Sequence, residues 1–235
     1  MKNNISYIAL SLLMTLAFTS CDDDSTEGQT WITYYPAIEL EGDETIYVDK
    51  GSDYEEPGYS ATYNGEDVSD EVSVSGSVDT DASGIYYLTY SVSADGSTAS
   101  ASRTVVVLDP DDPIEGLYDT DESCYRLYSG SYVYYGGYEI LILNYGDYYY
   151  VDDLLGGYYR DYCGYGDSYA MEGGIIANDD NTIELYYSYV SGWGDSAEFM
   201  SDGVFDPETG TMSWMIEYTT YPMDFYVTMY KRTIE

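Results

Sequence analysis

The sequence predicts an all-β protein with two units, a small β-sandwich and then an antiparallel up-and-down β-barrel or sandwich. Short β-rich runs recur from residue 37 onward, and Gly, Asn, Asp and Pro residues separate them. Tyrosine, which suits half-buried sheet faces, occurs 33 times against four phenylalanines. Residues 114–235 show no convincing helical period. Together these observations predict strands throughout the folded part.

The first twenty residues are predicted to be a secretion signal. Lys2 precedes an apolar run at residues 5–18, and two small residues lead to Cys21. The run is shorter than the roughly 20 residues that span a membrane. This order resembles a bacterial lipobox, although Phe18-Thr19-Ser20 departs from the strict Leu-Ala-Gly pattern. The resemblance implies cleavage after residue 20, a diacylglycerol on Cys21, and a lipid anchor in a membrane.

An acidic run follows the cysteine at Asp22-Asp23-Asp24. It resembles the export tag of Bacteroidetes surface lipoproteins, which implies lipid anchoring in the outer membrane and exposure at the cell surface. In other Gram-negative bacteria an aspartate at this place can mean retention in the inner membrane, so the leaflet stays open. Residues 22–30 lack an apolar period, and the segment 21–36 is predicted to be an acidic tether.

Residues 37–109 are predicted to form the first domain. Expected strands cover residues 37–40, 45–48, 59–63, 72–78, 84–93 and 99–108. Asn64-Gly65 and Asp95-Gly96 are hairpin turn signals. Six or seven short antiparallel strands in about 70 residues predict a small sandwich.

This domain also resembles a known family. The motifs are Ile46-Tyr47-Val48-Asp49-Lys50-Gly51-Ser52, Tyr54-x-Glu56-Pro57-Gly58, Val78-Asp79-Thr80, Gly84-x-Tyr86-x-Leu88-x-Tyr90 and Arg103-Thr104-Val105-x-Val107. They resemble the bacterial surface Ig-like domain of unknown function that also occurs in some pesticidal crystal proteins. The resemblance implies an Ig-like β-sandwich that serves as a spacer or an interaction platform.

Two prolines and three aspartates at residues 109–113 predict a domain boundary, with residues 110–113 as a proline hinge. Residues 114–235 then form an antiparallel β domain. Its expected strands cover residues 116–118, 123–128, 138–144, 148–152, 168–177, 182–190, 197–205, 211–218 and 224–230. Consecutive hairpins of this kind predict an up-and-down meander that closes into a barrel or folds into a sandwich.

The second domain is similar to the C-terminal β domain of Bacteroidetes lipoproteins. The shared motifs are Asp153-Leu154-Leu155-Gly156-Gly157-Tyr158-Tyr159, Gly164-Tyr165-Gly166, Gly192-Trp193-Gly194-Asp195-Ser196 and Phe205-Asp206-Pro207-x-Thr209-Gly210-Thr211-x-x-Trp214. Members pair this domain with the same Ig-like module and often occur among polysaccharide-utilisation proteins. The resemblance implies architecture and setting, and it carries no chemistry.

Charge and composition limit the function classes. Acidic residues outnumber basic ones 44 to 7, and loss of the signal peptide brings the net charge near −38. That charge repels nucleic acid, so expected partners are glycans, metal ions or other proteins, unless the acids serve solubility alone. Histidine is absent, which excludes histidine-based catalysis and histidine zinc sites. No metal, cofactor or phosphate motif is present, and we predict that the chain is not an enzyme.

Two loops depart from the strand pattern and hold the candidate site. Residues 153–167 are rich in glycine and tyrosine, and residues 191–196 carry a tryptophan between two glycines. The candidate ligand-binding residues are Trp193, Tyr158, Tyr159, Tyr162, Tyr165, Asp195 and Arg160. The alternative is that these loops plug the end of a barrel, with the tryptophan as a buried anchor and the arginine paired with a carboxylate.

The cysteines of the second domain, Cys124 and Cys163, allow either a disulfide or two free thiols. The expected function is non-catalytic binding of neutral glycan by a membrane-anchored surface lipoprotein in polysaccharide utilisation. The alternative is a structural or assembly role beside another outer-membrane protein.

Overall fold

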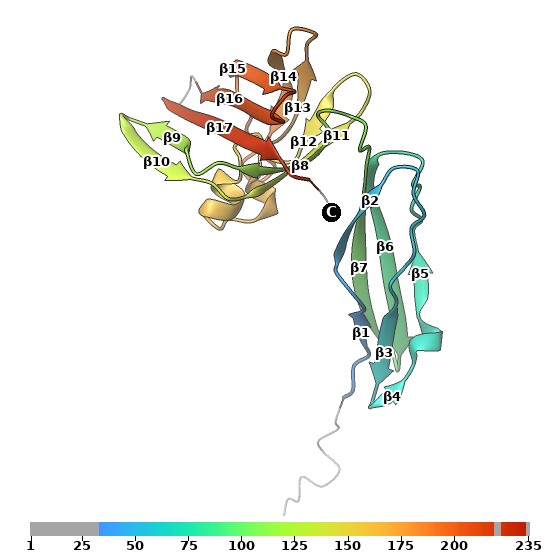
Figure 1. The fold of residues 1–235 in the computed structure, drawn as a ribbon. Helices are drawn as coiled ribbons and strands as arrows, with labels where there is room; N and C mark the ends of the chain where they lie inside the picture. The colour runs from blue at the N-terminus through green and yellow to red at the C-terminus, as the bar shows by residue number, and fades with distance from the viewer. Residues whose placement is uncertain (1–32, 219–221, 234–235) are drawn as a thin grey trace, which may run out of the picture.

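The computed structural model describes residues 33–218 and 222–233, which form two β domains (Figure 1). The predicted signal peptide, Cys21 and most of the predicted tether lie outside the described residues. Within the described part, no helix is both long enough and apolar enough to cross a membrane.

The first domain is a sandwich of two sheets, as predicted. One sheet contains β1 (Ala37–Leu40), β3 (Tyr59–Tyr63) and β4 (Glu66–Asp67). The other contains β2 (Thr45–Asp49), β7 (Ser97–Leu108), β6 (Gly84–Ala94) and β5 (Ser73–Ser75), in that order. The expectation of antiparallel strands is wrong at one pair, because β2 runs parallel to β7.

The predicted hairpin turns form as their residue types require. Asn64 and Gly65 have φ angles of 52° and 79°, and Asp95 and Gly96 have 46° and 79°. Two successive positive φ angles define the tight turn whose twist matches a β-hairpin, and Asn-Gly and Asp-Gly adopt it most readily. The second turn sets the register of the long β6–β7 hairpin, which pairs without a break from Ala94 to Gly84.

A fully buried arginine joins the two sheets of the sandwich. Arg103 on β7 donates to the Glu56 carboxylate at 3.0 Å and to the carbonyl oxygens of Glu41 and Gly58 at 2.7 and 3.1 Å. Glu41 follows β1 and Gly58 precedes β3, so these bonds cross the sandwich. A buried charge is tolerated only when its donors are satisfied in this way.

The second domain is one curled antiparallel sheet, and the β9–β10 hairpin forms one edge of it (Figure 1). Its strands are β8 (Gly116–Thr120), β9 (Cys124–Tyr128), β10 (Ser131–Tyr135), β11 (Glu139–Asn144), β12 (Tyr149–Val151), β13 (Glu172–Ala177), β14 (Ile183–Tyr189), β15 (Phe199–Asp206), β16 (Thr211–Tyr218) and β17 (Met223–Lys231). β10 was not among the predicted strands, and the pairing of β8 with β17 interrupts the predicted simple meander.

The curled sheet encloses the main core of the molecule. Every second residue of β16 is buried, and Trp214 at its centre is fully buried, as its alternation with Met212 and Ile216 predicts. The indole Nε1–H of Trp214 donates to the Leu154 carbonyl oxygen at 2.8 Å. This bond connects the core to the loop that begins after β12.

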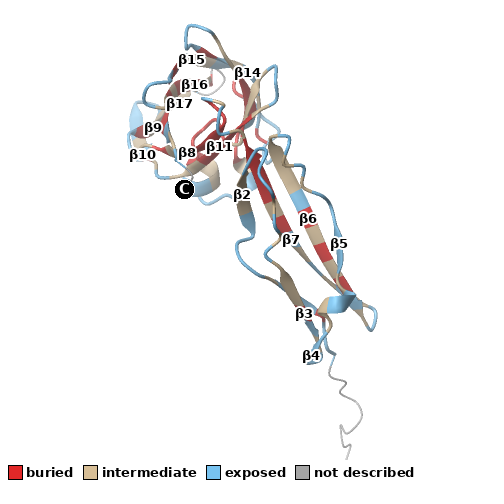
Figure 2. Ribbon diagram, turned by 45° about the vertical axis from the view of Figure 1, so that its right-hand side comes forward, coloured by how far each residue is buried: buried red, intermediate tan, exposed pale blue. Residues whose placement is uncertain are grey.

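The two domains are in contact on either side of the predicted hinge through a second apolar cluster. Val106 and Leu108 of β7 pack with Leu117, Leu141 and Leu143 of the second domain. Figure 2 shows buried residues along β7 that continue into the curled sheet. The boundary is therefore a packed junction.

Polar contacts reinforce this junction. The Tyr47 hydroxyl donates to the Glu139 carboxylate at 2.7 Å, and the Lys231 ammonium donates to the Asp112 carbonyl oxygen at 2.7 Å. The buried Glu115 carboxylate accepts from the backbone N–H groups of Asp109 and Asn144. These bonds fix the direction in which the curled sheet leaves the Ig-like domain.

Candidate functional site

The two candidate loops meet at the contact between Trp193 and Tyr159. The turn after β15 lies beside the domain junction, because Gly210 accepts a backbone bond from Lys231 and Lys231 also contacts the linker. Trp193 occupies the turn at the opposite end of β14 and β15. There its ring lies 4.6 Å from the ring of Tyr159, and the two rings are nearly perpendicular.

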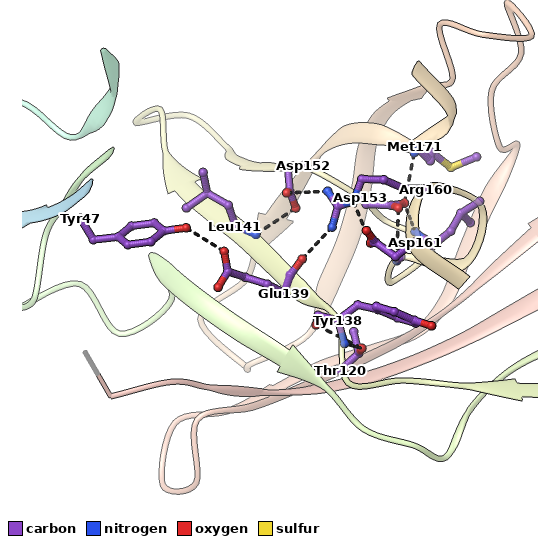
Figure 3. Close-up of polar contacts among 12 residues, drawn as sticks. Tyr47, Thr120, Tyr138, Glu139, Leu141, Asp152, Asp153, Arg160, Asp161 and Met171 are labelled. Carbon is purple, nitrogen blue, oxygen red and sulfur yellow. Dashed lines mark hydrogen bonds and ion pairs between the residues drawn. The ribbon is translucent and has the colours of Figure 1, made fainter. Parts of the chain in front are cut away.

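A buried carboxylate organises the first loop (Figure 3). Asp153 is fully buried and accepts backbone N–H bonds from Leu155 at 2.9 Å, Met171 at 3.1 Å and Gly157 at 3.2 Å. These bonds join the start of the loop to its return into β13. Burial raises the pKa of Asp153 to about 7, although the charge of Arg160 and the backbone donors act against that rise.

The glycine pair of the loop is required by its backbone geometry. Gly156 and Gly157 have φ angles of 61° and 82°. A Cβ on Gly157 would lie 2.8 Å from the Cβ of Tyr138, so a larger residue has no room there. The chain then makes one π-helical turn at Tyr158–Tyr162, which presents tyrosines on different sides.

Arg160 is paired with carboxylates of the protein, which is one of the two roles that its sequence position left open. Its guanidinium donates to the carboxylates of Asp152 and Asp161, each at 2.8 Å, and to the Glu139 carbonyl oxygen at 2.7 Å (Figure 3). Burial raises the pKa of Asp152, and the charge of Arg160 opposes that rise. Arg160 therefore holds the loop against β11 and is engaged with protein groups.

Four rings in mutual contact form the surface that we call the aromatic face: Tyr159, Tyr165, Tyr169 and Trp193. Tyr162 packs instead against the rings of Tyr135 and Tyr158. Trp193, Tyr162 and Tyr165 are 47%, 46% and 54% exposed. The rings of Tyr165 and Tyr159 stack at 6.0 Å, and the Tyr169 ring meets the Trp193 ring at 4.9 Å. Tyr169 was not among the predicted site residues, because it lies two residues beyond the tyrosine-rich loop at residues 153–167.

Tyr158 differs from its predicted partners because it is only 4% exposed. Its ring packs edge-on against Tyr135 and Phe225, and it stacks on Tyr162 at 5.4 Å. The guanidinium of Arg126 lies 5.2 Å from its ring centre. Tyr158 is thus a core residue that supports the aromatic face, and it offers no surface to a ligand.

The alternative of a plug with a buried tryptophan is correct for the inner part of the loop only. Leu154 and Leu155 are fully buried and close the end of the core, whereas Trp193 is half exposed. Asp195 is exposed beside it, and its carboxylate accepts from the Ser196 N–H at 2.8 Å. The loops therefore close the core and also present rings to solvent.

Both cysteines of the second domain are free thiols in the structure, so the disulfide alternative is not what the fold contains. Cys124 is buried, and its Sγ donates to the Thr228 carbonyl oxygen at 3.2 Å. Burial raises the pKa of Cys124 to about 11. Among residues 33–218 and 222–233, no group of three His, Cys, Asp or Glu side chains could hold a metal ion.

Comparisons with known proteins place the chain in a family. A bacterial surface protein Ig-like domain model matches residues 38–107, and a C-terminal domain model matches residues 108–231. The crystal structure of the lipoprotein BT2262 from Bacteroides thetaiotaomicron is similar, with 41% identity and a TM-score of 0.72 over 84% of this chain and 100% of that one. No curated protein matches the chain. The chain belongs to the family of that lipoprotein, in which a surface Ig-like domain precedes a C-terminal β domain.

Proposed function

We propose that this protein is a surface-anchored lipoprotein whose aromatic face binds neutral glycan without chemical turnover. The observation that carries the proposal is the half-exposed Trp193 ring, which packs edge-on against the rings of Tyr159 and Tyr169. Flat apolar rings bury the C–H face of a sugar, and the tyrosine hydroxyls at their edges bond its hydroxyl groups. Rings fixed before binding lose little conformational entropy when a ligand arrives.

The charge of the protein favours an uncharged ligand. The chain has a net charge of −37, and the exposed carboxylates Asp167 and Asp195 lie in the two loops of the aromatic face. Such a field repels acidic sugars, whereas carboxylate oxygens accept hydrogen bonds from neutral sugar hydroxyls.

The arrangement of the domains suits presentation away from a membrane. β1 lies at the end of the Ig-like domain farthest from the curled sheet (Figure 1). With a lipid on Cys21, the Ig-like domain stands between the anchor and the aromatic face. We extend the proposal to anchoring in the outer membrane and exposure at the cell surface, on the strength of the acidic run after Cys21.

Calorimetric titration of the whole chain tests the binding proposal. The ligands are neutral polysaccharides: amylopectin, xyloglucan, arabinoxylan, galactomannan and mixed-linkage β-glucan. The Trp193→Ala variant is expected to lose about tenfold or more in affinity for whichever binds, which corresponds to about 1.4 kcal/mol. Tyr132→Ala is the matched control, because Tyr132 on β10 is also about half exposed, at 54%. Equal affinity of wild type and Trp193→Ala, or no binding of the wild type to any of the five polysaccharides, contradicts the proposal.

The edge strand β10 favours a second candidate function, docking to another outer-membrane protein. Among the described strands β10 pairs only with β9, and its Tyr132 and Tyr134 side chains are exposed. An open strand edge offers backbone groups to a partner strand. Capture of a membrane protein that depends on Tyr134, with no response to any polysaccharide, would favour this function over glycan binding.

A further inference from the structure

The curled sheet stays open at one seam, between β14 and β15. The strands meet at one end through the bridge between Thr182 and Val204. At the other end the Ser188 hydroxyl accepts from the Ala197 N–H at 2.9 Å and donates to the Ala197 carbonyl oxygen at 3.3 Å. Between these contacts, no strand pairing joins residues 184–187 to residues 199–201 in the described chain. We call this opening the seam slit.

Irregularities in both strands hold the slit open. In β14 the register with β13 shifts so that Tyr186 is an extra residue opposite the Gly174–Ile175 step. In β15 the register with β16 shifts between Ser201 and Val204, where Asp202 has a φ of 52°. A bulge bends its strand and increases the local twist, so two bulges on facing strands turn them away from each other.

The closed end depends on a glycine. A Cβ on Gly203 would lie 2.2 Å from the carbonyl oxygen of Ile183, so β15 approaches β14 closely only because this residue has no side chain. The slit is thus a local opening in strands that are joined at both ends.

The slit has the size and the walls of a small-ligand site. Its volume is about 480 Å³, and it is lined by residues 184–188 and 196–200. Tyr186 and Phe199 are 58% and 56% exposed there. Ser188, Ser196 and Glu184 add polar groups. A few polar groups among aromatic walls are typical of ligand sites.

The shape and the charge of the slit limit the class of ligand that it can bind. Closure at both ends prevents an extended polypeptide from lying between the strands as an added strand. Among the described residues, no lysine or arginine lines the slit, whereas Glu184 and Glu198 do, so the lining does not favour an anionic group. Sugar hydroxyls can bond the polar groups, and the two rings can cover the apolar face of a sugar.

We propose that the seam slit binds one neutral sugar ring, as a second subsite for the glycan of the proposed function, on which this inference rests. The Ser188–Ala197 contact that ends the slit flanks the turn that carries Trp193. A glycan on the aromatic face therefore reaches the slit with an adjacent unit or a side branch. The ligand class narrows to neutral oligosaccharides of more than one unit.

Nuclear magnetic resonance of the ¹⁵N-labelled whole chain tests the slit directly. The probes are glucose, galactose, mannose, xylose and arabinose, each added alone at millimolar concentration. At least one sugar is expected to shift the amide signals of residues 184–188 and 199–201. Tyr186→Ala and Phe199→Ala are expected to weaken that binding by tenfold or more. Trp193→Ala and the control Tyr132→Ala leave it unchanged.

The outcomes separate this inference from the proposed function. If a polysaccharide binds through Trp193 and no sugar shifts the slit amides, the slit inference fails and the function stands. If no polysaccharide needs Trp193 while a sugar does shift the slit amides, the aromatic face fails and the slit remains a sugar site. Slit shifts caused by an N-acetyl-lysine amide and by none of the five sugars would overturn the inference in favour of a cationic side chain.

Discussion

Replacement of Asp153 by asparagine tests how the candidate loop is built. The amide keeps one oxygen for the N–H groups of Leu155 and Met171 but turns its NH₂ toward the N–H of Gly157. A buried donor without an acceptor costs about 1–3 kcal/mol. The Asp153→Asn variant should therefore be less stable than wild type at every pH at which the native carboxyl is protonated.

The shifted pKa of Asp153 sets how much the free energy of unfolding changes with pH. The ordinary pKa of the carboxyl is 3.8, and burial raises it to about 7 in the fold. Between these values the folded protein keeps a proton that the unfolded chain releases. The contribution of the Asp153 carboxyl to the free energy of unfolding is fully present below about pH 4 and is lost as the pH rises through about 7. From pH 5 to pH 8 the loss amounts to about 3 kcal/mol, at 1.36 kcal/mol for each tenfold change in proton affinity.

Urea unfolding at pH 5, 6, 7 and 8, followed by fluorescence, measures this effect. The difference in unfolding free energy between wild type and Asp153→Asn should be about 3 kcal/mol larger at pH 5 than at pH 8. Other carboxylates titrate in both proteins and cancel in the difference. Asp167→Asn, at an exposed position of the same loop, is measured alongside as the control for replacing a loop carboxyl by an amide. A difference that is constant with pH, or that grows as pH rises, would refute this account of the loop.

Three further predictions concern the core, the thiols and the domain junction. Trp214→Ala should cost about 3–5 kcal/mol of unfolding free energy in urea, because the ring is fully buried; a loss under 1 kcal/mol would contradict its place in the core. Iodoacetamide should label Cys163 in the native protein and Cys124 only after unfolding, as read by mass spectrometry; a disulfide-linked peptide pair would overturn the free-thiol assignment. Tyr47→Phe should lower the unfolding free energy by about 1 kcal/mol through loss of its bond to Glu139; unchanged stability would show that this bond contributes nothing.

Local chemistry made much of the fold predictable. β1, β3 and β16 begin and end at the predicted residues, because turn residues bound each of them and alternation marks their faces. β10 was missed because Tyr132, Val133 and Tyr134 sit between short glycine-containing turns that hide a five-residue strand. The parallel pairing of β2 with β7 depends on long-range topology, and local residue patterns do not show which strands pair or in which direction.

The site was predictable in its loops but not in the roles of individual residues. Glycine and aromatic density identified both loops, and Trp193 and Tyr165 are exposed in them. Tyr158 turned inward because a π-helical turn rotates it toward Phe225, and no sequence period signals such a turn. The seam slit was invisible because its bulges, at Tyr186 among others, arise from pairing with neighbouring strands.

The packed domain junction was also beyond local patterns. Two prolines correctly suggested an interruption after β7, yet Leu108, Leu117 and Leu141 form one apolar cluster across it. Each leucine lies in a continuous buried run of its own strand, and only the three-dimensional arrangement brings the three together. Experiments on this protein therefore use the whole chain.

Acrylamide quenching of Trp193 fluorescence tests the central claim most directly. Trp31 is replaced by phenylalanine to remove its signal, and Trp214 is fully buried, so Trp193 is the tryptophan that acrylamide reaches. The account predicts that a saturating neutral polysaccharide from the panel shields the ring and lowers the quenching constant. A bound polysaccharide that leaves the quenching of Trp193 unchanged would contradict it.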